Sequence, residues 1–344
     1  MEPLIRPVYF EHDRLYVLDQ TILPEKEVYL EITCVEEGVE AIKKLKVRGA
    51  PALGITAAYI FLLGIRDYIS SSEAVFERAR KVKRVLEKSR PTAVNLFWAL
   101  NRMYSKLKEL VSKNITGDTL YASLKAEADS ILEEDLQASR RMFENFLKLV
   151  PDGLSLAVLT HCNTGALATG GLGTALGAIR ALYDKGKVKH VYSTETRPLL
   201  QGARLTAWEL ERYGIPYNVI TDSAASYLIF QGKVDAVIVG ADRVAANYDT
   251  ANKIGTLSLA VSASFCNVPF FVVCPESTLD PDTSDGKEIE IELRSGEEVG
   301  IFNGRKIVPA PEKCLNYAFD VTPSKFLTAI VTDQRIITLR KLQW

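Results

Sequence analysis

The sequence predicts an α/β protein, with a mostly helical N-terminal domain carrying a small β-hairpin and a C-terminal domain built on a doubly wound, Rossmann-like parallel sheet. Apolar residues recur at helical spacing up to about Val150. Beyond it, short β-rich runs alternate with helical segments, and the turn-forming Pro-Asp-Gly at 151–153 separates the two patterns. The chain has 344 residues, enough for two domains, which we expect at residues 1–150 and 151–344.

The first half predicts a hairpin and a helical bundle. Residues 8–24 alternate apolar and polar side chains around a turn-like His-Asp-Arg at 12–14, which is typical of two short antiparallel strands. A periodic run from Leu124 to Leu147 predicts a long helix. An earlier helix is indicated by an apolar face that comprises Val75, Ala79, Val82 and Leu86.

The second half predicts parallel strands joined by helices. Helical segments at 173–186 and 199–214 separate the β-rich runs, and such long crossovers require parallel pairing with helices on both faces. Ligands of these sheets bind outside the carboxyl ends of the strands. The expected strands are SLAVLT (155–160), KHVYS (189–193), PYNVIT (216–221), VDAVIVG (234–240) and PFFVVC (269–274).

Composition and charge favour a small-molecule ligand. The formal net charge is -1, so no global field attracts nucleic acid or an anionic membrane. The first residues lack a signal-peptide core, and the longest apolar stretch, residues 52–65, is shorter than a membrane span. We therefore expect a cytoplasmic protein that binds neither membranes nor nucleic acids.

The cysteines and histidines indicate a reducing compartment and no metal centre. Five cysteines are scattered along the chain and odd in number, which does not make a disulfide framework. There are only three histidines and no C-x-x-C or H-E-x-x-H motif, so no metal site is expected.

Cys162 follows the first expected strand and has two interpretations. A free cysteine is usually a small buried hydrophobe. Here, glycines lead from it into a helix that begins near Thr174, and N–H groups at such a place stabilise a thiolate or an anion. The glycines, at 165, 170, 171 and 173, do not fit the G-x-G-x-x-G spacing, so NAD is not expected.

Polar residues follow the other expected strands as well. Asp242 follows the very apolar VDAVIVG, where desolvation would raise the pKa of a carboxyl group and suit it to general-acid catalysis. The alternative is an aspartate that caps the next segment or pairs with Arg243. The second and third strands are followed by Glu195, Thr196, Arg197, Asp222 and Ser223.

Basic residues near helix starts indicate an anionic ligand. Arg48 in KVRGAPALG and Arg90 in SRPTAVNLFWAL precede helix starts marked by glycine or proline. Asn252 and Lys253 precede the helix GTLSLAVSASF, where a lysine is poorly placed as a helix-dipole partner. The residues themselves thus indicate a phosphorylated ligand near a Cys/Asp pair.

Six motifs together resemble the 5-methylthioribose-1-phosphate isomerase family of methionine salvage. They cover nearly the whole chain, in the order VRGAPALG, RPTAVNLFWAL, LTHCNTGALAT, ETRPLLQGARLTAWEL, VGADRVAANYDTANKIGTLSLA and AFDVTP. The wider superfamily includes ribose-1,5-bisphosphate isomerases and regulatory subunits of the translation-initiation guanine-nucleotide exchange factor. Tyr317, Ser193 and Thr194 depart from the family pattern.

The resemblance implies a homodimeric aldose–ketose isomerase that works without a cofactor and converts 5-methylthioribose 1-phosphate into 5-methylthioribulose 1-phosphate. It places Cys162 and Asp242 at the catalytic pair. Asp242 would protonate the ring oxygen during opening, and Cys162 would assist moving hydrogen from C2 to C1, as a proton or as a hydride. The implied substrate-contacting residues are Arg48, Gly49, Ala50, Arg90, Gln201, Asn252 and Lys253.

Two alternatives stay open. An isomerase of ribose 1,5-bisphosphate would require a second basic cluster, whereas VRGAPALG and NLFWAL are apolar enough for a methylthio group. A non-catalytic regulatory subunit would have no reason to keep both Cys162 and Asp242.

Overall fold

The computed structural model describes residues 1–90 and 93–344, so two residues of the RPTAVNLFWAL motif, Pro91 and Thr92, lie outside the described residues.

The chain forms two compact units. Met1–Ala138 and Ala166–Gly173 make the first, and Ser139–Gly165 with the remainder from Thr174 make the second. The boundary between the two units lies inside the helix α5 (Gly117–Leu147), which runs without interruption from one unit into the other.

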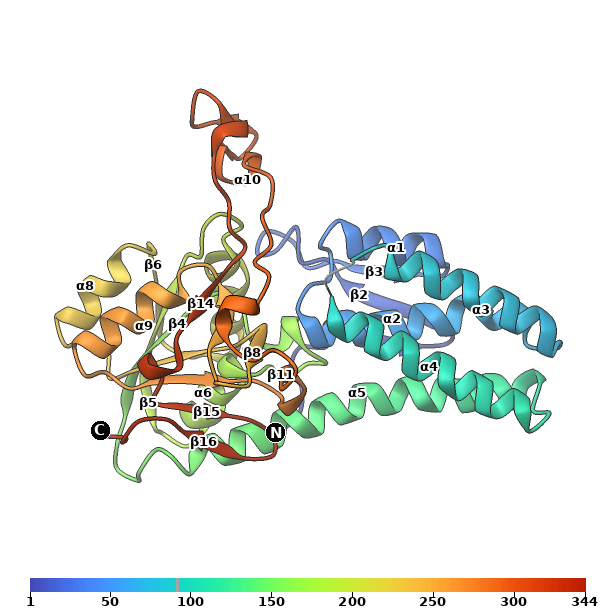
Figure 1. Cartoon of the computed structure of the whole chain (residues 1–344), viewed down its shortest axis with the longest axis horizontal. Coiled ribbons are helices and arrows are strands. Elements are labelled where there is room, and N and C mark those ends of the chain that lie inside the picture. The colour runs from blue at the N-terminus through green and yellow to red at the C-terminus, as the bar shows by residue number, and fades with distance from the viewer. Residues whose placement is uncertain (91–92) are drawn as a thin grey trace. The chain divides into compact units, whose positions relative to one another are not determined.

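The first unit joins a small antiparallel sheet to a helical bundle (Figure 1). The expected hairpin is present as β1 (Val8–Glu11) and β2 (Arg14–Leu18), and a third strand that the alternation did not predict, β3 (Tyr29–Ile32), pairs with β2. The helices are α1 (Val35–Lys43), α2 (Ala50–Ile65), α3 (Ser72–Glu87), α4 (Val94–Ser112) and the first part of α5.

Helix α2 is the core of this bundle. Every residue from Ala52 to Ile65 is buried. The segment Ala50–Tyr68 is long and apolar enough to cross a membrane by length and composition, so the expectation that no apolar segment reaches this length is wrong. In the structure, 78% of the most apolar 18 residues of this segment are buried. Packing against α1, α3 and α4 accounts for the apolar character of the helix.

The second unit contains the expected parallel sheet, in the order β16-β15-β10-β7-β4-β5-β6. All neighbouring strands pair in parallel except β15 and β16, which pair antiparallel at one edge. The five expected strands are confirmed as β4 (Leu156–Thr160), β5 (Val188–Thr194), β6 (Tyr217–Ile220), β7 (Ala236–Val239) and β10 (Phe270–Val273). Two unpredicted strands, β15 (Ala329–Val331) and β16 (Ile336–Thr338), extend the sheet.

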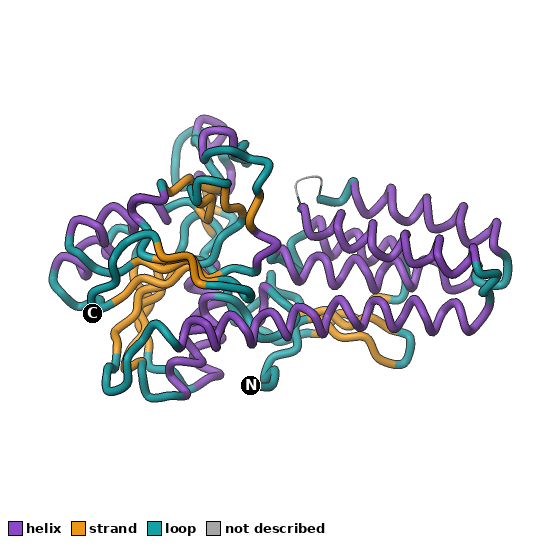
Figure 2. The backbone as a smooth tube through the Cα atoms, turned by 60° about the horizontal axis from the view of Figure 1, so that its bottom comes forward, coloured by secondary structure: helices purple, strands orange, loops and turns teal. Residues whose placement is uncertain are grey.

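Helices cover both faces of this sheet, as a doubly wound fold requires (Figure 2). The neighbouring helices α8 (Ala224–Phe230) and α9 (Thr256–Phe265) share an apolar core with the β7 side chains Val237 and Val239. Phe271 alternates with the core residues of β10 and instead packs edge-on against Phe146 of α5, at 5.1 Å between ring centroids. The remaining crossover helices are α6 (Ala175–Asp184) and α7 (Ala207–Tyr213).

After β7 the chain enters a second, separate sheet. Its strands are short, and no sequence pattern predicted them. Its order is β11-β8-β9-β14, with bounds Leu279–Asp280, Arg243–Ala245, Thr250–Lys253 and Phe319–Thr322. Between β11 and β14 the chain makes an excursion that contains α10 (Glu297–Gly300), β12 (Ile301–Phe302) and β13 (Arg305–Lys306) (Figure 1).

Candidate active site at the carboxyl edge of the sheet

The carboxyl ends of three neighbouring parallel strands, β4, β5 and β7, meet at one edge of the second unit's sheet. Cys162, Thr196 and Asp242 each follow one of these strands within three residues. A close approach joins two of the loops, because a Cβ on Gly240 would lie 2.7 Å from Thr164 Cγ2. The edge predicted for a ligand therefore carries the predicted thiol and carboxyl group.

Cys162 is held through its backbone from two sides. The residue is 7% exposed and left-handed, with φ of 62°. Its N–H donates to Thr196 Oγ1 at 2.9 Å, and its carbonyl oxygen accepts from Thr206 Oγ1 at 2.6 Å. The left-handed conformation costs a non-glycine residue about 1–2 kcal/mol. The two hydrogen bonds oppose the return of Cys162 to a negative φ.

Asp222 organises the loop that supplies Thr196. Its two carboxylate oxygens accept the backbone N–H groups of Thr196 at 2.8 Å and Arg197 at 2.7 Å. Thr196 is itself left-handed, with φ of 64°, which is an outlier for a β-branched residue. Both oxygens of Asp222 thus stabilise one strained turn.

His161, beside Cys162, is a buried neutral imidazole. Its Nε2 lies 2.8 Å from the carbonyl oxygen of Ile254, which can only accept, so Nε2 carries the proton. Its Nδ1 lies 2.6 Å from Thr194 Oγ1. Burial lowers the pKa of His161, which agrees with the neutral form.

Glu209 is a buried carboxylate that no sequence pattern singled out. Its Oε1 accepts from Asn163 Nδ2 at 2.8 Å, and its Oε2 accepts from the Tyr213 hydroxyl at 3.2 Å. The carboxylate packs directly on Gly165, where no side chain would fit. Glu209 therefore fixes the chain just beyond Cys162. From the sequence alone, a glutamate in a helix is expected to be exposed to solvent, so this role could not be predicted.

Asp242 differs from the expectation in one respect. Its side chain is exposed, so the predicted desolvation of this carboxyl group is wrong. The chain leaves the parallel sheet after β7, and the Asp242 N–H donates to the carbonyl oxygen of Ala251 in β9 at 2.9 Å. This bond places Asp242 beside Asn252, the next residue of β9.

Asn252 and Lys253 lie on the strand β9 and not directly at the helix entrance. Asn252 is buried and its Nδ2 donates to Thr256 Oγ1 at 2.9 Å. Lys253 Nζ donates to the Ala318 carbonyl oxygen at 3.1 Å and lies 4.8 Å from the ring centroid of Phe319. Both residues therefore belong to the sheet edge that carries Asp242.

The helix N-termini near the site are occupied by the protein's own groups. Asp320 accepts the N–H groups of Gly255 at 2.7 Å and Leu257 at 3.1 Å at the start of α9, and burial raises its pKa to about 6. The expected start of α6 near Thr174 is confirmed, but the first-turn N–H of Leu176 donates to Thr164 Oγ1 at 3.1 Å. These three N–H groups are therefore not free to bind an anion.

Gln201 presents an unsatisfied acceptor. It is 6% exposed and precedes the π-helical turn η3 (Gly202–Thr206) that follows β5. Its Oε1 is buried and has no hydrogen-bond partner among the described residues. A buried amide oxygen without a partner suits a ligand hydroxyl.

The remaining predicted residues, Arg48, Gly49, Ala50 and Arg90, belong to the first unit. Gly49 caps α2 with φ of 94°, and its Cα lies so close to the Ala168 backbone that a side chain would collide there. Arg48 precedes α2 and Arg90 precedes α4, and the N-terminal halves of these helices touch, since a Cβ on Gly54 would lie 2.9 Å from the Asn95 carbonyl oxygen. Both arginines thus precede helices that pack against each other in the first unit.

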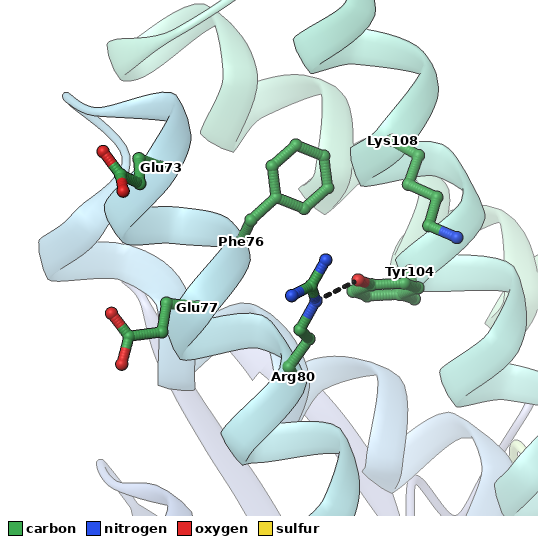
Figure 3. Close-up of a pocket in the computed structure, with 6 residues that line it drawn as sticks. All are labelled: Glu73, Phe76, Glu77, Arg80, Tyr104 and Lys108. Carbon is green, nitrogen blue, oxygen red and sulfur yellow. Dashed lines mark hydrogen bonds between the residues drawn. The ribbon is translucent and has the colours of Figure 1, made fainter.

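Two cavities bear on where a ligand binds. One of about 340 Å³ borders the sheet edge and is lined by His161, Thr194 and Asp222 together with residues of α8 and α9. The other, of about 410 Å³, lies between α3 and α4 (Figure 3). Its lining of Glu73, Phe76, Glu77, Arg80, Tyr104 and Lys108 contains none of the predicted site residues, and Arg80 Nε is engaged by the Tyr104 hydroxyl at 3.1 Å.

Known proteins resemble this chain over nearly its whole length. Residues 46–338 match the model of the initiation factor 2 subunit family. The methylthioribose-1-phosphate isomerase of Thermotoga petrophila is 50% identical over 94% of this chain and 92% of its own.

Two solved structures share the fold closely. The 5-methylthioribose 1-phosphate isomerase of Pyrococcus horikoshii OT3 has a TM-score of 0.90 and 42% identity, with 97% of this chain and 93% of that one covered. The delta subunit of translation initiation factor eIF-2B from A. fulgidus has a TM-score of 0.88 and 40% identity, with 97% and 96% covered.

We predict that Gly49→Ala destabilises the protein by more than a positive φ alone explains. Its Cβ would meet the Ala168 backbone, and overpacking costs about 1–3 kcal/mol beyond the backbone strain. Gly153→Ala is the matched control, because Gly153 has φ of 86° and nothing within 4 Å of a Cβ. Urea unfolding of both variants checks this, and equal losses would contradict it.

Proposed function

This chain belongs to the initiation factor 2 subunit family, and we propose that it converts 5-methylthioribose 1-phosphate into 5-methylthioribulose 1-phosphate. The single observation that carries this function is 50% identity, over nearly the full length of both chains, to a methylthioribose-1-phosphate isomerase. The family expected from the six sequence motifs is thereby confirmed. The enzyme is an aldose–ketose isomerase.

The chemistry of the substrate defines what the site has to do. Phosphate on C1 blocks the hydroxyl through which a free sugar opens to an aldehyde. The bond between C1 and the ring oxygen must therefore break with protonation of that oxygen, and one hydrogen must move from C2 to C1 while the C2 hydroxyl becomes a carbonyl. The atoms balance within the substrate, so no co-reactant is needed.

In this proposal, Asp242 and Cys162 share the reaction. Asp242 donates a proton to the ring oxygen, and Cys162 assists the transfer of hydrogen from C2 to C1. Their positions after β7 and β4, on adjacent strands of one sheet edge, support the pairing. Because Asp242 is exposed without substrate, the proposal requires bound substrate to desolvate its carboxyl group.

Substrate binding is assigned to the seven other predicted residues. Arg48, Arg90 and Lys253 suit the phosphate by charge, and the unsatisfied Oε1 of Gln201 suits a sugar hydroxyl. The remaining three, Gly49, Ala50 and Asn252, contribute backbone or amide hydrogen bonds.

We further propose that the enzyme is a cytoplasmic homodimer that associates through α8 and α9. These two helices, AASYLIF and TLSLAVSASF, contain no charged residue, although 25% of the chain is charged. Phe230 is 66% exposed and Phe265 79% exposed, while Ser226 and Ser262 join the helices at 2.8 Å. A two-fold interface brings one patch against its own copy, and an uncharged patch does so without repulsion.

The function is tested by incubating the purified chain separately with 5-methylthioribose 1-phosphate and ribose 1,5-bisphosphate and following the ketose carbonyl by 13C NMR. We expect the methylthio substrate to be preferred by about tenfold or more in kcat/KM. A preference for the bisphosphate would favour that isomerase, and no ketose from either would favour a regulatory subunit of the kind that the A. fulgidus neighbour represents.

Replacing either member of the catalytic pair is expected to abolish most turnover. Asp242→Asn and Cys162→Ser should each lower kcat by about 10² to 10⁴, because each removes a positioned acid–base group. Asp235→Asn is the control, since Asp235 lies at the opposite end of β7. If Asp242→Asn turned over at a near-normal rate, the general-acid role would have to be given up.

Phe265→Glu should convert the dimer to a monomer, because it buries two charges against each other across the two-fold axis. Sedimentation velocity measures the change. Val85→Glu, which replaces an apolar residue of α3 that is 46% exposed, should leave the dimer intact. A wild-type monomer, or dimers that survive Phe265→Glu, would refute this interface.

A further inference from the structure

The buried Cys162 N–H and carbonyl oxygen are each hydrogen-bonded to a threonine side chain. We propose that Thr196 and Thr206 are positioning residues that hold the Cys162 thiol in its reactive place by clamping its left-handed backbone. The inference rests on the proposed function, and it adds two residues that act through Cys162 and not on the substrate.

The first argument is conformational. With φ of 62°, Cys162 is in a region that a non-glycine residue leaves unless its surroundings hold it. Rotation to negative φ would redirect the Cα–Cβ bond and carry the sulfur with it. Thr196 Oγ1 on the N–H, at 2.9 Å, and Thr206 Oγ1 on the carbonyl oxygen, at 2.6 Å, oppose that rotation from both sides.

The second argument is the direction of the hydrogen bonds. The Cys162 N–H can only donate to Thr196 Oγ1, which lies 3.0 Å from Thr194 Oγ1. The neutral His161 accepts from Thr194 at Nδ1, so the Thr194 proton is used there and the Thr196 hydroxyl donates to Thr194. The Thr196 hydroxyl has two acceptors on Thr194, Oγ1 at 3.0 Å and the carbonyl oxygen at 3.3 Å, so both fix Thr196 to the residue that contacts His161.

The third argument is the rigidity of the anchors. Thr196 and Thr206 are both fully buried, and both belong to the segment between β5 and α7. Asp222 fixes Thr196 by accepting its N–H at 2.8 Å. Asn163 Nδ2 donates to Thr206 Oγ1 at 3.3 Å and to the buried Glu209 at 2.8 Å. Because hydrogen bonds hold both threonines in place, the two threonines in turn hold the Cys162 backbone in one conformation.

The test compares hydroxyl loss with hydroxyl retention. Thr196→Val and Thr206→Val keep the shape and remove the hydroxyl, while Thr196→Ser and Thr206→Ser retain it. We expect each valine variant to lower kcat by about 10- to 100-fold with KM within about threefold of wild type, because displacing a reacting group by about 1 Å costs this much. The serine variants should keep kcat within about threefold.

A matched control separates positioning from general stability. Thr328→Val also removes a buried threonine hydroxyl that accepts a backbone N–H, from Phe270 at 2.9 Å, on the same sheet but away from Cys162. Its kcat should stay within about threefold of wild type. If Thr196→Val does not fold, Thr196→Gly replaces it, since glycine adopts φ of 64° without strain and still lacks the hydroxyl.

A second readout does not depend on turnover. The rate at which iodoacetamide alkylates Cys162 in the folded protein, measured on its peptide by mass spectrometry, should rise at least about threefold in the valine variants and not in the serine variants. Valine variants with wild-type kcat and alkylation rate, or serine variants that lose as much as valine, would overturn the clamp. If wild type does not isomerise the sugar, the proposed function fails, and the alkylation rates alone decide the clamp.

Discussion

Parallel pairing of β4, β5 and β7 is the constraint on which the site depends. These strands come from segments up to about 80 residues apart, yet parallel order brings all their carboxyl ends to one edge. Cys162 and Asp242 therefore follow neighbouring strand ends. Val237 and Val239 point to one face of β7 and Ala236 and Ile238 to the other, and all four are buried because helices pack on both faces.

The loop that carries Cys162 is more tightly bonded than the turn that carries Asp242, in agreement with the different roles proposed for these two residues. The loop after β4 is buried and bonded to Thr196, Thr206 and Glu209 through its backbone and through Asn163. A buried polar network of this kind is stable only when its members are satisfied, and it then fixes one geometry. Asp242 instead lies exposed on the turn between the two sheets. In the proposed mechanism, a thiol on a backbone held by two hydrogen bonds works with an acid that bound substrate would cover.

Much of the fold follows from the sequence, because buried parallel strands such as AVIV in β7 are continuous apolar runs with helices between them. The small sheet of β8, β9, β11 and β14 could not be predicted, since strands of two to four mixed residues carry no periodic signal. Cys162 and Asp242 could be singled out as candidates from their places after strands. The partners of Cys162 could not, because threonines and a glutamate in loops and helices are indistinguishable from solvated residues until the chain has folded.

The most direct measurement is a crystal structure of this chain with 5-methylthioribulose 1-phosphate bound. The account predicts Cys162 Sγ and a carboxylate oxygen of Asp242 both within about 4 Å of the C1–C2 fragment or the oxygen that closed the ring, with Cys162 still left-handed. A ligand in the cavity between α3 and α4, or one that meets only one of the two groups, would contradict it.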